Sequence, residues 1–415
     1  MIRTAIETRL RDSGAGTPDW GVSPAYGDYC FAGIPHTVAG WLGVDTGPDL
    51  PPDVIPAADF TPEIVLVVLI DGYGLTQWTR DRPTHAFLDR LSDRATVTPL
   101  TSVYPSETAA ALTTFHSGVL PAEHGVIGWN VYEPTIDQSF EALPFRTKAG
   151  NAPTGLSRAD VADAEPLDPR FTAAGVDYRQ VVPSDITPAG RTVHPYDDLD
   201  AFPGQLKTAI EAADPPAYVY AYLPQIDTVA HAHGTTATAY RTTLAAILDR
   251  LEAVFSGLDP GTAEDILLVV TADHGHVDTD PDRNIDLSTV STLESHLRRH
   301  ADGTPVRFAG SARNVHLHLE SGAVDSVREA LDPLIDGLIL TKEEVLDSGL
   351  FGPTPSEMFR RRLGDLLVTH RDLGVWWGDA EPSTLAHVGM HGGLHPDEML
   401  VPFAVVRLAD LVSDG

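Results

Sequence analysis

Aspartate and histidine side chains of the kind that bind metal ions occur in four separated stretches of this 415-residue chain. Asp227 and His231 are four residues apart, so on a helix they share one face and could bind the same ion. Asp273 and His274 are adjacent, and in a loop both side chains could reach one point. The full set of ligand candidates is Asp71, Asp227, His231, Asp273, His274 and His391. These carboxylates and imidazoles divide into two sites with mixed nitrogen and oxygen ligands, a donor set that suits zinc or manganese.

Other histidines close to these motifs are expected to have no part in metal binding. His233, His276 and His395 stand beside the motifs, and a lone histidine is more often a surface residue or a hydrogen-bonded core residue. The sequence therefore predicts that these three are bystanders.

A hydroxyl nucleophile is expected at Thr108. Pro105 favours the start of a helix, which places Thr108 in the first helical turn. The free N–H groups and the helix dipole there favour a phosphate and an ionised hydroxyl. A cation would lower the hydroxyl pKa further, and its ligands would be Asp71, Asp273 and His274. Ser102 and Ser106 are nearby alternatives.

Four apolar runs precede or follow these motifs and predict the elements that position them. The runs are residues 64–70, 217–223, 266–271 and 399–406. Short runs that are apolar on both faces are typical of buried parallel strands. Helical patterns at 108–117 and 238–256 lie between them. The alternation predicts an α/β fold with a mostly parallel central sheet and helices on both faces, and such sheets carry their sites beyond the carboxyl ends of the strands.

Two stretches interrupt this alternation, residues 131–215 and 282–385. The first is rich in Pro, Ala, Asp and Thr with one strand expected near 175–182, and the second has a strand expected at 314–319 and helices at 323–335 and 341–349. We expect one α/β domain over residues 1–415, in which both stretches are insertions that cap the end of the sheet. Residues 1–60 are expected to be loop-like after a short amphipathic start.

The chain is strongly acidic, with 59 Asp and Glu against 28 Lys and Arg and a formal net charge of −31. This balance argues against nucleic acid and anionic membranes as partners, because both need clustered basic residues. Only Lys148, Lys207 and Lys342 are lysines. An acidic surface poor in lysine indicates adaptation to high salt, where charges are screened within a few ångströms.

The remaining features favour a soluble cytoplasmic protein. Cys30 is the single cysteine, so no internal disulfide can form. The N-terminal residues lack the apolar run of a signal peptide, and no stretch approaches the ~18 apolar residues of a membrane span. The sequence leaves the oligomeric state open.

The motifs together resemble the alkaline phosphatase superfamily, and they are most similar to its nucleotide pyrophosphatase/phosphodiesterase branch. The segments that carry the resemblance are IDG (70–72), PSET (105–108), PAEHGVIGWN (121–130), DTVAHAHG (227–234), TADHGH (271–276) and MHGG (390–393). They occur between residues 64 and 406, which is most of the chain.

The resemblance implies two zinc ions and a threonine nucleophile. In that family one zinc is held by residues matching Asp71, Thr108, Asp273 and His274, and the other by residues matching Asp227, His231 and His391. The threonine forms a phospho-enzyme that water then hydrolyses. An asparagine bonds the phosphoryl oxygen, and its match here is Asn130, offset by one residue. Ala109 stands where relatives often have an aromatic residue of a nucleobase slot, which argues against a nucleotide substrate.

The sequence therefore predicts a two-metal hydrolase of small phosphate esters, with phosphodiesters or pyrophosphates preferred over monoesters. Residues 109–118 contain no Lys or Arg to meet the second charge of a monoester, although Arg146, Lys148, Arg179 or Arg313 could supply it. Phosphomonoester hydrolysis and a metal-dependent phosphomutase reaction are the alternatives. A metal-stabilised binding protein is disfavoured, because structural zinc usually needs only four ligands.

Overall fold

A seven-stranded sheet forms the centre of the protein, whose computed structural model describes residues 2–12, 18–55, 60–186 and 192–413. In spatial order its strands are β2 (Thr96–Thr101), β18 (Leu400–Arg407), β9 (Ile266–Thr271), β1 (Ile64–Ile70), β8 (Ala217–Leu223), β6 (Asp177–Pro183) and β7 (Thr192–Tyr196). Strands β1, β8 and β9 have the predicted bounds and pair in parallel. The sheet is thus mixed and mostly parallel, which confirms the predicted α/β fold.

Strand β18 runs antiparallel to both of its neighbours, β9 and β2. This corrects the expectation that the last apolar run is a parallel strand. Burial on both faces selects apolar residues in either direction, so the run itself does not encode its orientation.

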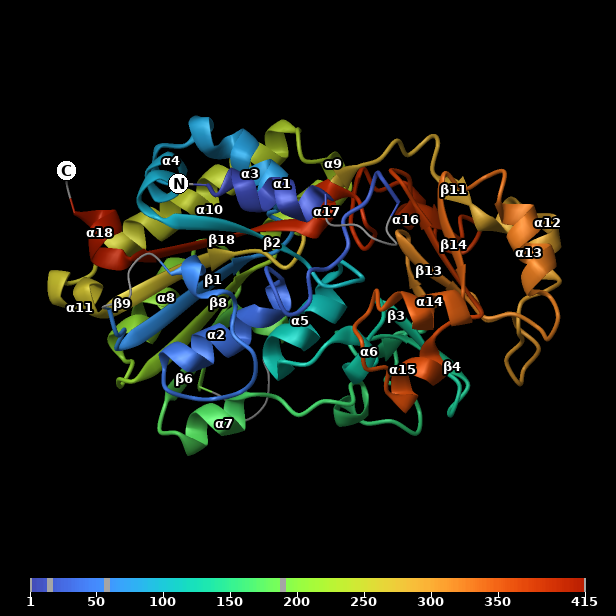
Figure 1. The fold of residues 1–415 in the computed structure, drawn as a ribbon, viewed down its shortest axis with the longest axis horizontal. Coiled ribbons are helices and arrows are strands. Elements are labelled where there is room, and N and C mark those ends of the chain that lie inside the picture. The colour runs from blue at the N-terminus through green and yellow to red at the C-terminus, as the bar shows by residue number, and fades with distance from the viewer. Residues whose placement is uncertain (1, 13–17, 56–59, 187–191, 414–415) are drawn as a thin grey trace.

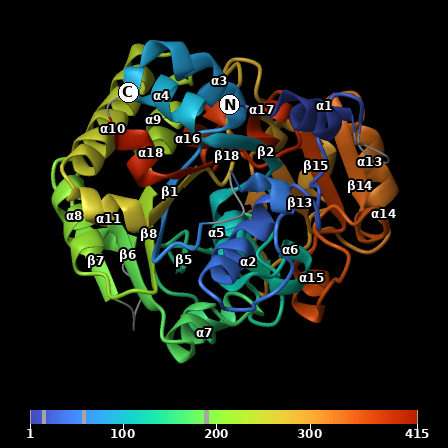
Figure 2. The same cartoon turned by 60° about the vertical axis from the view of Figure 1, so that its left-hand side comes forward.

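Helices cover both faces of the central sheet (Figures 1 and 2). One face carries α3 (Leu75–Asp81), α4 (Ala86–Arg94), α8 (Phe202–Glu211), α9 (Gln225–His233), α10 (Thr238–Ser256), α11 (Pro260–Asp265) and α18 (Leu408–Val412). The other carries α2 (Ile34–Trp41), α5 (Thr108–Ser117) and α7 (Asp168–Ala173). Helices α5 and α10 have the predicted bounds.

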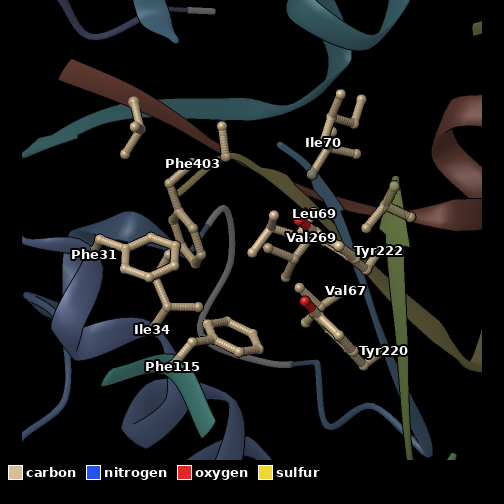
Figure 3. Packing of buried hydrophobic residues seen from close by; sticks show 14 of the residues in the cluster. Phe31, Ile34, Val67, Leu69, Ile70, Phe115, Tyr220, Tyr222, Val269 and Phe403 are labelled. Atoms are coloured by element: carbon tan, nitrogen blue, oxygen red, sulfur yellow. The ribbon is translucent and has the colours of Figure 1, made fainter. Parts of the chain in front are cut away.

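Aromatic packing fixes α5 against the sheet, as Figure 3 shows. Phe115 on α5 lies 5.2 Å from the ring of Tyr220 on β8 and 5.6 Å from that of Phe31, between centroids. All three side chains are buried. Burial of one such aromatic side chain stabilises the fold by roughly 1.5–3 kcal/mol. The anchored helix in turn holds its first residue, Thr108, in place.

A second seven-stranded sheet lies beside the first, on the right of Figure 1. Its strands in spatial order are β14 (Gly337–Thr341), β15 (Leu366–His370), β13 (Asn314–Leu317), β12 (Gly310–Ser311), β3 (Asn130–Glu133), β4 (Gln138–Glu141) and β5 (Arg146–Thr147). All its pairings are antiparallel. Helices α12 (Ser291–Glu294), α13 (Val324–Leu331), α14 (Lys342–Ser348), α15 (Glu357–Arg362) and α16 (Pro382–Leu385) accompany it.

The segment 131–215 does not form one insertion. Its first part, through β5, joins the second sheet, whereas β6 and β7 extend the central sheet by pairing onto β8. This corrects the expectation that the whole segment caps the end of the central sheet, because β6 and β7 are hydrogen-bonded members of that sheet. The segment 282–385 supplies the remaining strands of the second sheet. Its role as a cap, and the single-domain description, stay predictions.

Two further pairs of short strands and three short helices complete the fold. They are β10 (Val277–Asp278) with β17 (Gly389–Met390), β11 (Ile285–Asp286) with β16 (Val375–Trp376), and α1 (Thr4–Asp12), α6 (Pro121–His124) and α17 (Pro396–Met399). Within the N-terminal segment, 13–17 and 56–59 lie outside the described residues. In the parts of the chain that the structure describes, no helix has both the length and the apolar character to cross a membrane.

Candidate metal centre

The predicted ligands lie where the parallel strands end. Asp71 directly follows β1, Asp273 lies two residues beyond β9, and Asp227 lies in the first turn of α9 after β8. Because these strands are in register, their carboxyl ends meet at one edge of the sheet. His391 reaches the same edge from the residue after β17. Four separated stretches thus converge, as the sequence analysis anticipated.

One group of ligands surrounds Asp71 and His274. The Nε2 atom of His274 lies 3.2 Å from Asp71 Oδ1 and 3.6 Å from Asp273 Oδ2. It also lies 3.0 Å from the hydroxyl oxygen of Thr108. All of these side chains are buried.

Two carboxylate oxygens of this group have no hydrogen-bond partner among the described residues, although both are buried. They are Asp71 Oδ1 and Asp273 Oδ2, whose sister oxygens accept bonds from Tyr222 Oη and from the Gly72 and His274 N–H groups. A buried charged oxygen without a partner is costly. The donor set therefore fits a cation that both free oxygens would contact.

A second group surrounds Asp227. Its Oδ1 atom lies 3.1 Å from His276 Nε2, 3.3 Å from His231 Nε2 and 3.4 Å from His391 Nε2. Each of these residues offers one ligand atom, and the four atoms lie within 4.8 Å of one another. Asp227 also lies within the same reach of Asp71 and His274, so it stands between the two groups.

The tautomers of the four histidines are set by the backbone. In each ring Nδ1 faces a carbonyl oxygen, and a carbonyl can only accept, so Nδ1 carries the proton and donates it. In a neutral ring the Nε2 lone pair then points into the site. The Nδ1–oxygen distances are 2.7 Å for His231 to Gly389, 3.0 Å for His274 to Gly275, 3.0 Å for His276 to Gly72, and 3.3 Å for His391 to Ser106. Backbone carbonyls orient metal-binding histidines in this way.

The electrostatics of the site are those of an acidic cluster. Burial, together with the neighbouring Asp71 carboxylate, raises the pKa of Asp273 well above its usual value. Burial opposes the charged form of His274, but the carboxylates of Asp273 and Asp71 raise the pKa of His274 to about 10. Burial and the proximity of His274 hold the pKa of His391 well below its usual value. Divalent cations would meet this excess of negative charge.

Thr108 is distinguished from the two alternative nucleophiles by its contacts. The Ser102 hydroxyl donates to the Asp273 carbonyl, and the Ser106 hydroxyl donates to the Gly393 carbonyl at 2.8 Å. Both serines therefore brace the loops that carry ligands. Thr108, the first residue of α5, instead has its hydroxyl against His274.

A cavity of about 360 Å³ opens onto this cluster. Thr108, Asn130, Asp227, His231 and His391 are among the residues that line it. The lining also includes Trp129, Glu141, Lys148, Trp376 and Glu381, none of which belongs to the central sheet. The volume suits a small organic ester.

Asn130 lies in the cavity wall at the start of β3, but its amide also has a structural contact. The nitrogen donates to the Gly310 carbonyl at 3.1 Å, and the side-chain oxygen is buried without a partner among the described residues. One of the two amide hydrogens of Asn130 is therefore donated to a strand of the second sheet.

Glu107, directly before the nucleophile candidate, was not singled out by the sequence analysis. It is buried, it lines the cavity, and its Oε2 has no partner among the described residues. Burial raises the pKa of Glu107 to about 7, against the opposing influence of Ser311 and the Trp129 backbone. No spacing rule identified it, because a Glu at a helix start normally faces solvent.

The structure places the three expected bystander histidines differently. His233 is exposed on α9, and the His395 ring accepts from the Asp397 N–H at the start of α17. His276 instead lies inside the second group of ligands. The signal that could have found it is its position two residues after His274, in the same loop beyond β9.

Both the sequence and the fold resemble known proteins. Residues 65–394 match the family described as type I phosphodiesterase / nucleotide pyrophosphatase. No curated protein sequence matches the chain significantly. Murine ectonucleotide pyrophosphatase/phosphodiesterase 5 is similar in structure, with a TM-score of 0.64 and 17% identity over 84% of this chain and 92% of that chain. Its inactive threonine-to-alanine variant, solved in complex with AMP, has a TM-score of 0.63 and 16% identity over the same shares, 84% and 92%.

A bacterial enzyme shares the fold as well. Phosphonoacetate hydrolase from Sinorhizobium meliloti 1021, in complex with phosphonoformate, has a TM-score of 0.59 and 18% identity over 85% of this chain and 94% of that chain. Identities this low show a common fold.

Proposed function

Because the chain belongs to the type I phosphodiesterase / nucleotide pyrophosphatase family, we propose that it is a two-metal phosphoric-ester hydrolase with Thr108 as its nucleophile. The observation that carries the proposal is the contact of Thr108 Oγ1 with His274 Nε2 at 3.0 Å, beside the unpartnered oxygens of Asp71 and Asp273. The inactive threonine-to-alanine variant of the murine relative supports a threonine nucleophile.

Two groups of side chains would hold the cations. One consists of Asp71, Thr108, Asp273 and His274, and the other is built on Asp227, His231 and His391. Mixed nitrogen and oxygen donors suit Zn²⁺, and Mn²⁺ is the second choice. When bound, such cations lower the pKa of a hydroxyl and neutralise charge that develops on the attacking and leaving oxygens.

The residues of the chain then carry out two displacements. The Thr108 hydroxyl gives up its proton and its oxygen attacks phosphorus; the Oγ–P bond forms as the bond from phosphorus to the leaving oxygen breaks, and the leaving oxygen takes up a proton. Water attacks in the second displacement, the Oγ–P bond breaks, and a proton from that water returns to Thr108. The N–H groups in the first turn of α5 have no helical acceptors and can bind the phosphoryl oxygens. The second amide hydrogen of Asn130 supports a similar role, since Gly310 uses only one.

The charges of the cavity support diesters as the preferred substrates. Lys148 is the one Lys or Arg among the described residues that line the cavity. Its ammonium lies 2.7 Å from Glu381 and 3.2 Å from Glu141, so two carboxylates already neutralise it. The extra negative charge of a monoester dianion would therefore find little cationic help, whereas a monoanionic diester needs less.

The arginine side chains that could have supplied positive charge to the site form ion pairs with other residues. Arg313 is buried against Glu398, Arg179 pairs with Asp177, and Arg146 pairs with Glu141 at the surface. None of these arginines is among the described residues that line the cavity.

A substrate comparison with metal-free and reloaded protein tests the proposed function. Chelation should abolish turnover of bis-nitrophenyl phosphate, and Zn²⁺ or Mn²⁺ should restore it. The panel should add nitrophenyl phosphate, a nucleotide diester and phosphonoacetate, the last because of the bacterial relative. Full activity without metal would refute the proposal. A monoester advantage of tenfold or more in kcat/KM, about 1.4 kcal/mol, would favour the phosphomonoesterase alternative.

A further inference from the structure

His276 is brought to the metal centre by a short two-stranded ribbon. Strands β10 and β17 pair antiparallel, with Val277 opposite Met390. His276 precedes Val277 and His391 follows Met390, so the two histidines emerge from the same end of the ribbon. Their ring centroids lie 5.3 Å apart, and the His276 side chain is buried.

The backbone at Gly72 holds the His276 ring in one orientation. Nδ1 of His276 donates to the Gly72 carbonyl at 3.0 Å. Gly72 has φ of 72°, and a Cβ at this position would come within 2.2 Å of the ring. A glycine is therefore needed for this close approach.

The ring so oriented points a lone pair at an anion. With its proton on Nδ1, neutral His276 has an acceptor at Nε2, yet Nε2 lies 3.1 Å from the carboxylate oxygen Oδ1 of Asp227. Two acceptors cannot share a hydrogen bond, so either a second proton or a cation must lie between them. The same conflict occurs between His231 Nε2 and His391 Nε2, which face each other at 3.2 Å. One cation at the common point resolves both conflicts, whereas protonation would need a separate proton for each.

We propose that His276 is a fourth protein ligand of the cation held by Asp227, His231 and His391. This inference rests on the metal dependence in the proposed function. The resulting donor set has three nitrogens and one oxygen, whereas the other group has one nitrogen with oxygens from Asp71, Asp273 and Thr108. First-row transition ions generally bind imidazole more tightly than Mg²⁺ or Ca²⁺ do, so the nitrogen-rich site would select a transition ion over Mg²⁺ or Ca²⁺.

The ligand number has a consequence for the choice of metal. Four protein ligands complete a tetrahedral shell, while a catalytic site must leave a position for substrate. If His276 is a ligand, a cation bound here would have to accept a further ligand when substrate binds. This requirement favours ions that expand their coordination readily.

Cobalt titration of the metal-free protein tests the assignment without using turnover. The wild type should bind two equivalents of Co²⁺, and His276→Ala should weaken one of them by at least tenfold and change the visible ligand-field spectrum of that equivalent. His231→Ala should do the same as a positive control. His233→Ala is the matched negative control, since His233 is an exposed histidine on the same helix as His231. His276→Gln provides a second variant of similar size, with circular dichroism to verify folding.

Three outcomes would overturn the inference, and they can be told apart. If His276→Ala and His276→Gln bind Co²⁺ as the wild type does, His276 is not a ligand. If the affinity falls but the spectrum of bound Co²⁺ is unchanged, His276 acts by positioning Asp227. If the wild type itself binds neither Co²⁺ nor Zn²⁺, the proposed function fails together with the inference.

Discussion

Arg313 and Glu398 form a fully buried ion pair behind the loop that carries His391. Arg313 Nη2 lies 2.6 Å from Glu398 Oε1, and neither side chain is exposed to solvent. Glu398 also accepts the N–H of Gly393 at 3.0 Å, two residues after His391. The pair therefore ties β12–β13 of the second sheet to the segment before β18, at the position where a metal ligand must be held.

Loss of this pair should destabilise the protein strongly. In Arg313→Met the Glu398 carboxylate stays buried without its counter-charge, and we expect the free energy of unfolding to fall by about 3–5 kcal/mol. Arg328→Met is the matched control, because the Arg328–Glu344 pair is 42% and 44% exposed and should contribute about 0–1 kcal/mol. Denaturant unfolding of both variants measures the difference. Equal midpoints would show that the buried pair adds nothing to stability.

Thr108→Ala should lower kcat by several orders of magnitude while the fold is retained, because the covalent route is lost. Thr108→Ser should keep part of the activity. Thr113→Ala is a suitable control on the same helix, since the Thr113 hydroxyl donates only to the Ala109 carbonyl. Normal turnover by Thr108→Ala, with loss in Ser102 or Ser106 variants, would assign the nucleophile to a serine.

Lowering the pH should reduce the free energy of unfolding, because Glu133 becomes protonated. Burial opposes its ionisation, but hydrogen bonds from Arg361, Thr135 and Arg362 lower the pKa of Glu133 to about 2. In the unfolded chain the pKa of a Glu is about 4.3. The ionised Glu133 carboxylate thus contributes fully to the free energy of unfolding above that pH. This contribution is lost as the pH falls through about 2.

Glu133→Gln should therefore be less stable than the wild type at pH 7 but lose less stability between pH 5 and pH 2. Glu343→Gln, which changes an exposed carboxyl on α14, provides the control. Denaturant midpoints across this pH range measure both. A Glu133→Gln profile parallel to that of the wild type would contradict the assignment.

Molar salt should stabilise the fold. The net charge of −31 causes self-repulsion that is strong in dilute buffer and screened at high ionic strength. We propose adaptation to high salt on this ground and expect the thermal midpoint to rise markedly from dilute buffer to molar KCl or NaCl. A flat response in both salts would refute it.

Strands buried on both faces could be predicted from the sequence, while an edge strand could not. β1, β8 and β9 are continuous apolar runs, and their bounds follow from composition. β2 contains Pro99, which argues against a strand, but β2 lies at the edge of the sheet, where a missing N–H is tolerated. Helix α2 was also missed, because IPHTVAGW contains Pro and Gly and carries no polar face.

Some site residues could likewise be predicted from the sequence, whereas others could not. Asp71, Asp227 and Asp273 follow strands that the sequence reveals, so their convergence could be inferred. His276 depends on the pairing of β10 with β17, each only two residues long, and on the close approach of its ring to Gly72. Contacts of this kind arise from tertiary packing and leave no periodic pattern in the sequence.

The place of β18 inside the sheet, next to the edge strand β2, has a consequence for biosynthesis. This strand lies late in the chain, yet it fills the place between β2 and β9, and His391 precedes it by a few residues. While the ribosome is still adding the middle of the chain, β2 lacks its strand neighbour β18 and one cation site lacks its ligand His391. Metal loading should therefore follow synthesis rather than accompany it, and nascent or truncated chains should depend on chaperones to shield the open sheet.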